Sequence, residues 1–384
     1  MGKYNNWYFY LIAKAYRIFI RMLIAPLVTW KSQSSVEDGC TAIIGLCSSL
    51  PWILPANLRG LRLAKWPELK EVIIVVDRFR DDFFASFEEG MMKEFKDLNI
   101  RFIYYGFFQK TMADILKLPY VNSWLSWCIA IRETKTSSFF IQDYDALLLG
   151  DVLSARYLDF KESKSVFYAV SWYGEANGIV KSDNLGVTFE AFVDTSWARS
   201  QKAIQIFNRI GLINDRPVDF DTFLYLQSRY SDISQRKAVA MTDGGLVHPS
   251  QMISQYTVYK RRPGHPWDCS ALVMIPFFYY VSGQQDIFRK ALMNIRSRKG
   301  MVIELLADGC LMNFENLETE HLNRILDLIL QGFGGLGIPL FEDFYNYGNA
   351  FYDLIETPAQ KRLNFFKTDH SNSGSCFPLP VAER

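Results

Sequence analysis

The stretch FFIQDYDALLL (139–149) sets the interpretation of the whole fold. An apolar run ends in Asp143-Tyr144-Asp145, and a second apolar run follows after Ala146. Apolar runs of this length, without polar alternation, are typical of strands that are buried on both faces of a parallel sheet. Ligands of such sheets bind at the carboxyl ends of the strands, so the acidic pair is predicted to lie at a binding edge.

The rest of the chain alternates between strand and helix patterns. Strands are expected at 41–47, 71–77, 100–106, 137–142, 165–174 and 186–194. Helices are expected at 55–66, 84–98, 123–135, 195–211, 219–230, 286–298 and 319–331, with the last ending at the glycines of 332–337. This order predicts an α/β fold, a mostly parallel sheet flanked by helices, followed by a mainly helical C-terminal region.

Composition excludes several classes of protein. The 384 residues are 49% hydrophobic and 22% charged, and 42 Lys and Arg nearly balance 41 Asp and Glu. A chain of this kind folds around a core and has no overall basic field for nucleic acid. The six cysteines are widely spaced, which argues against a structural zinc or a disulfide framework and favours a reducing, cytoplasmic location. No pattern of a cleavable signal peptide is present.

Residues 4–30 combine apolar side chains with Lys14, Arg17 and Arg21, whose spacing of three and four places them on one face of a helix. We expect an amphipathic helix in the interface of the inner face of a membrane, with its cations toward anionic headgroups. A helix that packs on the protein or on a partner subunit is the alternative. A spanning helix ranks third, because a charge near the bilayer centre costs about 3 kcal/mol.

The acidic pair has the chemistry of a divalent-metal site. Alternate residues of an extended segment point to the same side, so Asp143 and Asp145 can reach one ligand, whereas Tyr144 points away. Mg²⁺ and Mn²⁺ prefer carboxylate oxygens and leave room for substrate phosphates. The alternative is that the pair only ends a strand or begins a turn.

Further candidates precede and follow this pair. Asp77 ends the strand EVIIVVD (71–77), where it faces either a nucleotide base or merely a turn. Asp219 and Asp221, at the predicted start of the helix 219–230, are each either a helix cap or a general base. His248, in MTDGGLVHPSQ (241–251), is an additional ligand suited to Mn²⁺ or a structural histidine.

The run KRRPGH (260–265) offers Lys260 and Arg261 as cations for a diphosphate or a lipid phosphate. The alternative is a solvated charge run, which is the more frequent role of such a segment.

Taken in this order, these residues resemble the inverting family 2 glycosyltransferases of the GT-A fold over residues 40–260. The resemblance implies that Asp77 contacts the nucleotide base, that Asp143 and Asp145 bind phosphate and metal, that Asp219 is the base, and that His248 assists the metal. It implies transfer of a sugar from a nucleoside-diphosphate sugar, expected to be UDP-linked, to a glycan or a lipid-linked acceptor, with Mn²⁺ or Mg²⁺ as cofactor.

Two departures from the family pattern bear on these roles. Val218 stands where an acidic residue usually precedes the base, which leaves the choice between Asp219 and Asp221 open. RFRDD (78–82) replaces the usual small, glycine-containing turn after Asp77. A non-catalytic binding or assembly subunit at a membrane, and a retaining transferase, therefore stay open as alternatives. A sugar nucleotidyltransferase is disfavoured, because 45–55 lacks the basic, glycine-rich loop that would hold a triphosphate.

The expected organisation has four parts. Residues 1–35 form the membrane-associating helix, 40–265 the GT-A domain, 266–370 a helical region and 371–384 a flexible tail.

Overall fold

The computed structural model describes residues 6–30, 36–174, 177–241, 245–265, 268–298 and 300–366. The expected tail at 371–384 lies outside the described residues. The chain divides into two compact units. The first comprises Met1–Pro51, Leu61–Ala146 and Asp151–Asp243, and the second comprises Trp52–Gly60, Leu147–Gly150 and Gly244–Arg384. Each unit is described by itself.

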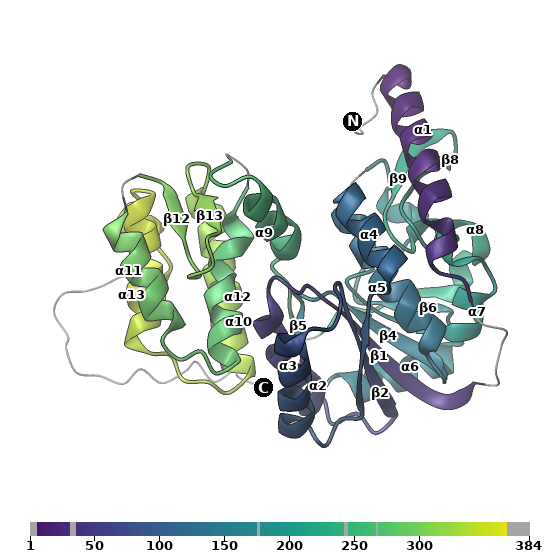
Figure 1. Cartoon of the computed structure of the whole chain (residues 1–384), viewed down its shortest axis with the longest axis horizontal. Helices are drawn as coiled ribbons and strands as arrows, with labels where there is room; N and C mark the ends of the chain where they lie inside the picture. The colour runs from purple at the N-terminus through teal and green to yellow at the C-terminus, as the bar shows by residue number, and fades with distance from the viewer. Residues whose placement is uncertain are drawn as a thin grey trace. The chain divides into compact units, whose positions relative to one another are not determined.

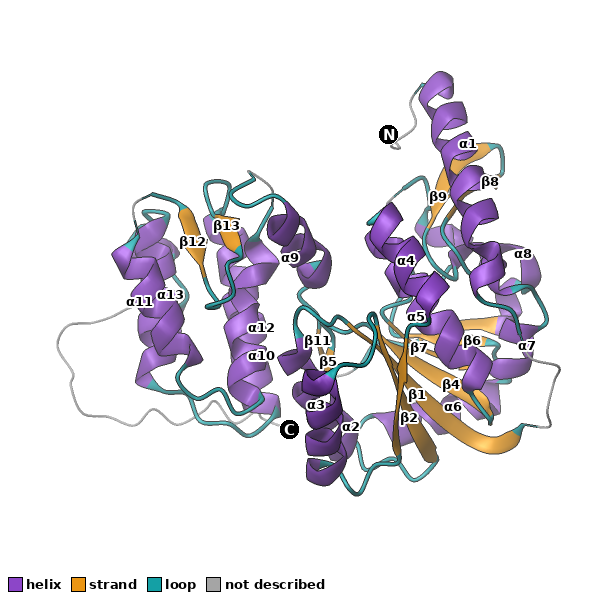
Figure 2. Cartoon of the chain, in the orientation of Figure 1, coloured by secondary structure: helices purple, strands orange, loops and turns teal. Residues whose placement is uncertain are grey.

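The first unit is built on a seven-stranded sheet with the order β10-β6-β7-β4-β1-β2-β3. Its strands are β1 (Glu37–Leu46), β2 (Leu69–Val76), β3 (Ile100–Tyr104), β4 (Thr136–Gln142), β6 (Phe167–Ala169), β7 (Glu190–Asp194) and β10 (Arg236–Ala238). All neighbouring pairs are parallel except those of β7, which runs antiparallel to both β4 and β6. Figure 2 shows β1, β2, β4, β6 and β7 in orange among the helices of the unit.

Helices of this unit are α1 (Trp7–Ile24), α3 (Asp82–Glu94), α4 (Phe107–Leu116), α5 (Pro119–Glu133), α6 (Leu153–Ser163), α7 (Thr195–Arg199) and α8 (Leu224–Tyr230). The first of them, α1, is capped by Asn6, whose side chain accepts the Tyr8 N–H at 2.9 Å. It gives way at Pro26 to a 3₁₀ turn, Ala25–Leu27, because proline cannot donate the next helical hydrogen bond. Figure 1 shows α1 in purple beside the strands β8 (Arg209–Ile213) and β9 (Arg216–Phe220).

Both faces of the sheet are covered by aromatic side chains. On one face, Phe140 of β4 and Phe192 of β7 contact Trp66, and Phe192 also stacks on Phe160 of α6. On the other face, Phe139 contacts Phe223, as does Trp127 of α5. A strand whose successive side chains are both buried cannot alternate in polarity, which explains the uninterrupted apolar run of β4.

Two predicted helices form only over part of their predicted length. Residues 195–211 form the short helix α7, a 3₁₀ turn at Ala203–Gln205 and the beginning of β8 (Arg209–Ile213). The segment 219–230 begins in β9 (Arg216–Phe220), so Asp219 lies on a strand and α8 starts only at Leu224. The antiparallel β8–β9 hairpin explains both errors, since short apolar runs fit a strand as well as a helix.

The second unit is mainly helical. Its elements are β5 (Leu147–Leu148), β11 (Leu246–Val247), α9 (Met252–Arg261), α10 (Ile275–Val281), α11 (Ile287–Ser297), the hairpin β12 (Val302–Glu304) and β13 (Leu311–Asn313), α12 (Thr319–Gly335) and α13 (Glu342–Leu354). The helix α2 (Leu54–Leu63) begins in this unit and ends in the first one.

An aromatic core holds the helices of the second unit together. Phe288 of α11 contacts Phe333 of α12, and it also contacts Phe344 and Tyr347 of α13. The Tyr347 hydroxyl donates to the Val273 carbonyl at 2.8 Å, so the polar end of this buried ring is satisfied. The predicted class, a mostly parallel α/β sheet flanked by helices and followed by a mainly helical region, is thereby confirmed.

Candidate functional site

The acidic pair lies on a tight turn that directly follows β4. The Ala146 N–H donates to the Asp143 carbonyl at 3.0 Å, and the Asp143 N–H donates to the Phe189 carbonyl at 2.8 Å. Tyr144 points away from the pair, as the strand period predicts, and its hydroxyl donates to the carbonyls of Leu50 and Pro51. The turn is thus held on both sides, and Asp145 keeps only 4% of its surface exposed.

A short antiparallel strand pairing brings His248 close to the acidic pair. In the antiparallel pairing of β5 and β11, Leu148 lies opposite Leu246 and Leu147 lies opposite Val247. Continued by one residue, this register places His248 opposite Ala146, which directly follows Asp145. The Leu149 N–H extends the pairing by donating to the Gly245 carbonyl at 2.9 Å.

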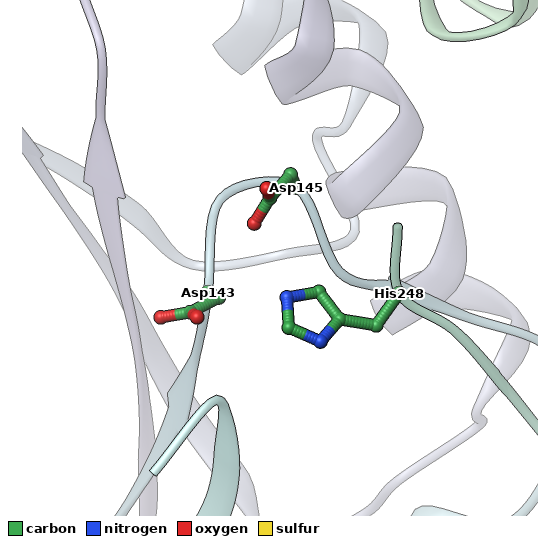
Figure 3. A group of neighbouring side chains, drawn as sticks. All are labelled: Asp143, Asp145 and His248. Carbon is green, nitrogen blue, oxygen red and sulfur yellow. The ribbon is translucent and has the colours of Figure 1, made fainter. Parts of the chain in front are cut away.

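The three side chains form a candidate metal centre. One ligand atom each from Asp143, Asp145 and His248 lie within 4.8 Å of one another. Figure 3 shows the imidazole of His248 extending toward the turn that carries Asp143 and Asp145. Two carboxylates and one imidazole are a donor set that suits Mn²⁺, and the carboxylates alone also suit Mg²⁺. The residues present therefore fit the expected divalent ion.

Two glycines let helices approach the strand that follows the acidic turn. A Cβ atom on Gly60 of α2 would lie 2.8 Å from the Leu148 carbonyl oxygen, and one on Gly335 of α12 would lie 2.6 Å from a Leu149 methyl group. No side chain fits at either position without a shift of its surroundings. The helix α12 was predicted to end at 331, but it continues through Gly335, which packs against Leu149 directly after β5.

Asp77 lies at the same edge of the sheet. It follows β2, and its Oδ1 accepts the Ser48 N–H at 2.8 Å from the turn after β1. Since β1 separates β2 from β4, Asp77 and Asp143 extend from strands that are about 10 Å apart. Burial raises the pKa of the Asp77 carboxyl, and the hydrogen bonds from Ser48 partly oppose that rise.

Asp219 and Asp221 are close in sequence but differ in surroundings. Asp219 is buried on β9, with its Oδ1 4.0 Å from an Arg17 guanidinium nitrogen. Asp221 lies after the strand and accepts hydrogen bonds from Asn208 Nδ2 and the Thr222 N–H, both at 2.7 Å. Burial raises the pKa of Asp221. Within the described part of the chain, neither aspartate belongs to the candidate metal centre.

Lys260 and Arg261 lie in the last turn of α9, whereas His248 precedes the first turn of that helix. The Lys260 ammonium contacts the Asp308 carboxylate at 3.3 Å and donates to its backbone carbonyl. A ten-residue helix is about 15 Å long, so this lysine is a helix length from the start of α9. The structure does not bring either cation to the candidate metal centre.

Two charged residues near these positions were not expected there. Arg17 was assigned to a membrane surface, yet it contacts Asp219 and lies over the Tyr120 ring at 4.0 Å. Glu190 is 1% exposed and pairs across the strands with Gln142, the residue before Asp143. A charged residue inside the apolar run TFEAFVD (188–194) was the available signal for Glu190.

Comparison with known proteins gives only distant similarities. No family model matches the chain, and no curated protein matches it. Three solved structures illustrate what the chain is similar to. The mannosyltransferase PcManGT from Pyrobaculum calidifontis in complex with GDP-Man and Mn²⁺ is 12% identical, with 91% of this chain and 99% of that chain covered and a TM-score of 0.35.

The galactosyltransferase LgtC in complex with donor and acceptor sugar analogs is 9% identical over 65% of this chain and 96% of that chain, with a TM-score of 0.39. S. aureus TarS 1–349 in complex with UDP-GlcNAc is 14% identical over 84% and 82%, with a TM-score of 0.31. All three TM-scores lie below 0.5, a level at which similarity between two chains establishes neither a shared fold nor a shared activity.

Proposed function

We propose that the protein is a metal-dependent glycosyltransferase that moves a sugar from a nucleoside-diphosphate sugar, in the first instance a UDP-sugar, to a glycan or lipid-linked acceptor. The observation that carries the proposal is the convergence of Asp143, Asp145 and His248 at the carboxyl edge of a mostly parallel sheet. An open α/β sheet binds its ligands at this edge. The resemblance to family 2 glycosyltransferases assigns the same three positions to metal and phosphate.

The candidate metal centre would hold Mn²⁺ or Mg²⁺. When bound there, such an ion supplies positive charge that neutralises a diphosphate leaving group. The protein's own contribution is to hold the carboxylates in place, because the Tyr144 hydroxyl and the Asp143 backbone fix the turn. Asp77, held by Ser48, is proposed to contact the nucleotide base.

In an inverting transfer, a general base takes the proton of the acceptor hydroxyl as its oxygen bonds to the anomeric carbon, and the nucleoside diphosphate leaves from the opposite face. Asp221 is favoured as this base over Asp219. Burial raises the pKa of Asp221, which makes its carboxylate a better proton acceptor. Asp219 lies beside the Arg17 guanidinium, so its carboxylate already contacts a cation of the protein.

Lys260 receives no support as a phosphate ligand, because Asp308 already pairs with it. Arg261 is exposed on the same turn of α9 and stays a proposal for phosphate contact, on its charge alone.

The helix α1 supports a peripheral membrane location, but in an orientation opposite to the expected one. Arg17 and Arg21 turn toward the protein, where Arg17 contacts Asp219 and Arg21 donates to Gln205 Oε1 at 3.2 Å. The expectation that the α1 cations face anionic headgroups is therefore wrong for Arg17 and Arg21. The outer side is apolar, with side chains that are at least 40% exposed at Trp7, Tyr8, Phe9, Leu11, Ile12, Tyr16, Ile18, Phe19, Met22 and Leu23.

The neighbouring helix α4 adds exposed Phe107, Phe108 and Ile115. Gln109 Nε2 donates to the Leu27 carbonyl at 3.1 Å, which ties α4 to the end of the α1 segment. Such an aromatic, apolar surface fits the interfacial region of a bilayer. In the described ranges, no helix has both the length and the apolar character needed to cross one.

A non-catalytic subunit is the second candidate function, and one observation favours it. Arg17 lies beside Asp219, the residue that the family resemblance would make the base. If the protein is a non-catalytic subunit, UDP either does not bind or binds equally well with and without Mn²⁺. Isothermal titration of UDP with and without Mn²⁺ measures this directly.

The proposed activity is tested by a hydrolysis screen of nucleotide sugars with Mn²⁺, since water can replace the acceptor and thereby reveal the donor. We expect one donor to be cleaved, and Asp145→Asn to lower that rate by about 100-fold or more, because several kcal/mol of charge stabilisation are lost. Asp151→Asn, which changes an exposed carboxylate shortly after the turn, serves as the matched control. Full activity of Asp145→Asn, or of wild type with all metal chelated, would contradict the mechanism.

A further inference from the structure

A pocket of about 180 Å³ lies entirely within the second unit. Three segments line it, namely the residues that follow His248, the loop before α10, and the first turns of α12. Its polar lining residues are Ser250, Gln251, Gln255, Asp268, Ser270, His321 and Arg324. None of them belongs to the candidate metal centre, so the function proposed above does not account for the pocket.

Gln255 indicates that the pocket is built for a ligand. This side chain lines the pocket from α9, and only 5% of the residue is exposed. No atom among the described residues hydrogen-bonds to its Oε1. A buried carbonyl oxygen without a partner costs about 1–3 kcal/mol, so its place in a pocket wall is explained by a ligand that donates a hydrogen bond to it.

The remaining polar groups offer both donors and acceptors. Arg324 and His321 lie three residues apart on α12, both exposed, and among the described residues no hydrogen bond or ion pair engages either one. Asp268 adds a carboxylate, one oxygen of which accepts the Ser270 N–H at 3.0 Å. The lining therefore suits a ligand that both accepts hydrogen bonds, from Arg324, and donates them, to Gln255 and Asp268.

An inorganic anion does not meet this description. Phosphate would be repelled by the Asp268 carboxylate, and the one or two P–OH groups that it keeps near neutral pH would have to donate to both Gln255 Oε1 and Asp268. A sugar has hydroxyl groups that both donate and accept. The pocket also has an apolar part, Pro249 and Ile325, that suits the C–H face of a pyranose ring.

We propose that this pocket binds a neutral sugar residue of the acceptor. The assignment to an acceptor rests on the glycosyltransferase function proposed above, whereas the sugar chemistry rests on the pocket alone. Gln255 Oε1 accepts a hydrogen bond from a sugar hydroxyl, and Arg324 donates one to a sugar oxygen. The Asp268 carboxylate accepts a hydrogen bond from a second hydroxyl.

Binding of simple glycosides to the full-length protein tests this proposal. The probes are the methyl glycosides of glucose, galactose, mannose and N-acetylglucosamine, followed by saturation-transfer NMR. We expect at least one glycoside to bind the wild type. Gln255→Met removes the acceptor oxygen at similar side-chain length, and Arg324→Ala removes the exposed donor without touching the core. Each should weaken binding about tenfold, which is the loss of one hydrogen bond.

The matched control is Arg296→Ala, an exposed arginine of α11 that does not line the pocket. It should leave glycoside binding unchanged. Three results would overturn the proposal, namely no glycoside binding, equal binding by Gln255→Met, Arg324→Ala and wild type, or displacement of the glycoside by sodium phosphate.

Failure of this proposal is distinguishable from failure of the proposed function. Donor hydrolysis without any glycoside binding would leave the transferase function standing and remove the pocket's role. Glycoside binding that depends on Gln255, in a protein that cleaves no nucleotide sugar, would leave a sugar-binding pocket and remove the transferase function.

Discussion

At the scale of single residues, the two aspartates of the β9 segment show how surroundings separate similar groups. Asp219 and Asp221 are two positions apart, yet a guanidinium lies beside the first and the second is held by Asn208 and Thr222. Carboxylates whose environments differ in this way take different roles. The first is suited to hold Arg17 and α1 in place, and the second is suited to accept a proton.

The pH dependence of stability tests the state of Asp221. Because burial raises its folded pKa above the unfolded value near 3.9, the folded protein binds the proton more tightly. This contribution to stability is full below the unfolded pKa and is lost as pH rises through the folded pKa. The variant Asp221→Asn lacks this contribution. As pH rises from about 4, the unfolding free energy of wild type should therefore fall relative to that of the variant.

Urea unfolding of both proteins across this pH range measures the difference, with Asp151→Asn as control. Parallel stability curves for wild type and Asp221→Asn would contradict the raised pKa. In the donor assay with acceptor present, the same variant should lose about 100-fold or more in rate if Asp221 is the base.

At the scale of elements, α1 is amphipathic with its polar side inward. Tyr10, Ile20 and Ile24 are buried together with the contacts of Arg17 and Arg21, while the large apolar side chains face outward. A surface of this kind on a helix that is already packed on its own domain indicates a site of apolar interaction. We assign it to a lipid surface on account of its aromatic residues, which favour the bilayer interface.

Vesicle binding tests this assignment. The double variant Phe19→Ser, Met22→Ser removes two exposed apolar side chains and should weaken sedimentation with phosphatidylcholine vesicles by about tenfold or more, because each side chain contributes roughly 1–2 kcal/mol on burial. Since Arg17 and Arg21 of α1 face the protein, added phosphatidylglycerol should increase binding only slightly.

The control is Met293→Ser, which changes a methionine of α11 that is also largely exposed. A dimer in size-exclusion chromatography without lipid, which the double variant dissociates, would show that a second copy of the chain covers this surface instead.

At the scale of the whole molecule, the candidate metal centre links stability to ligand binding. Its ligands come from distant parts of the chain, so only the folded protein holds them together. A ligand that binds the folded state alone stabilises it by about 2.7 kcal/mol at a concentration of 100 times Kd.

Thermal unfolding with and without Mn²⁺ measures this linkage without any assay of activity. We expect Mn²⁺ to raise Tm in wild type and in Asp151→Asn, and this shift to be small or absent in Asp143→Asn and His248→Gln. An equal shift in all four proteins would place the ion elsewhere.

The sequence by itself determined the parts of the protein that local periodicity encodes. The apolar runs at 41–47, 71–77 and 137–142 became β1, β2 and β4, because strands buried on both faces need such runs. The same period of two turned Asp143 and Asp145 away from Tyr144, so the acidic pair could be placed before the fold was known.

Only the tertiary structure decided the rest, since it depends on contacts between residues far apart in the chain. The hairpin β8–β9 replaced predicted helix because pairing, not local preference, decides short apolar segments. Pairing of β11 with β5 brought His248 to the acidic turn. The contact with Asp219 holds Arg17 against the protein, whereas the charge of Arg17 had predicted a position at a membrane surface. The pocket around Gln255 likewise joins α9 to α12, and no single stretch of sequence contains it.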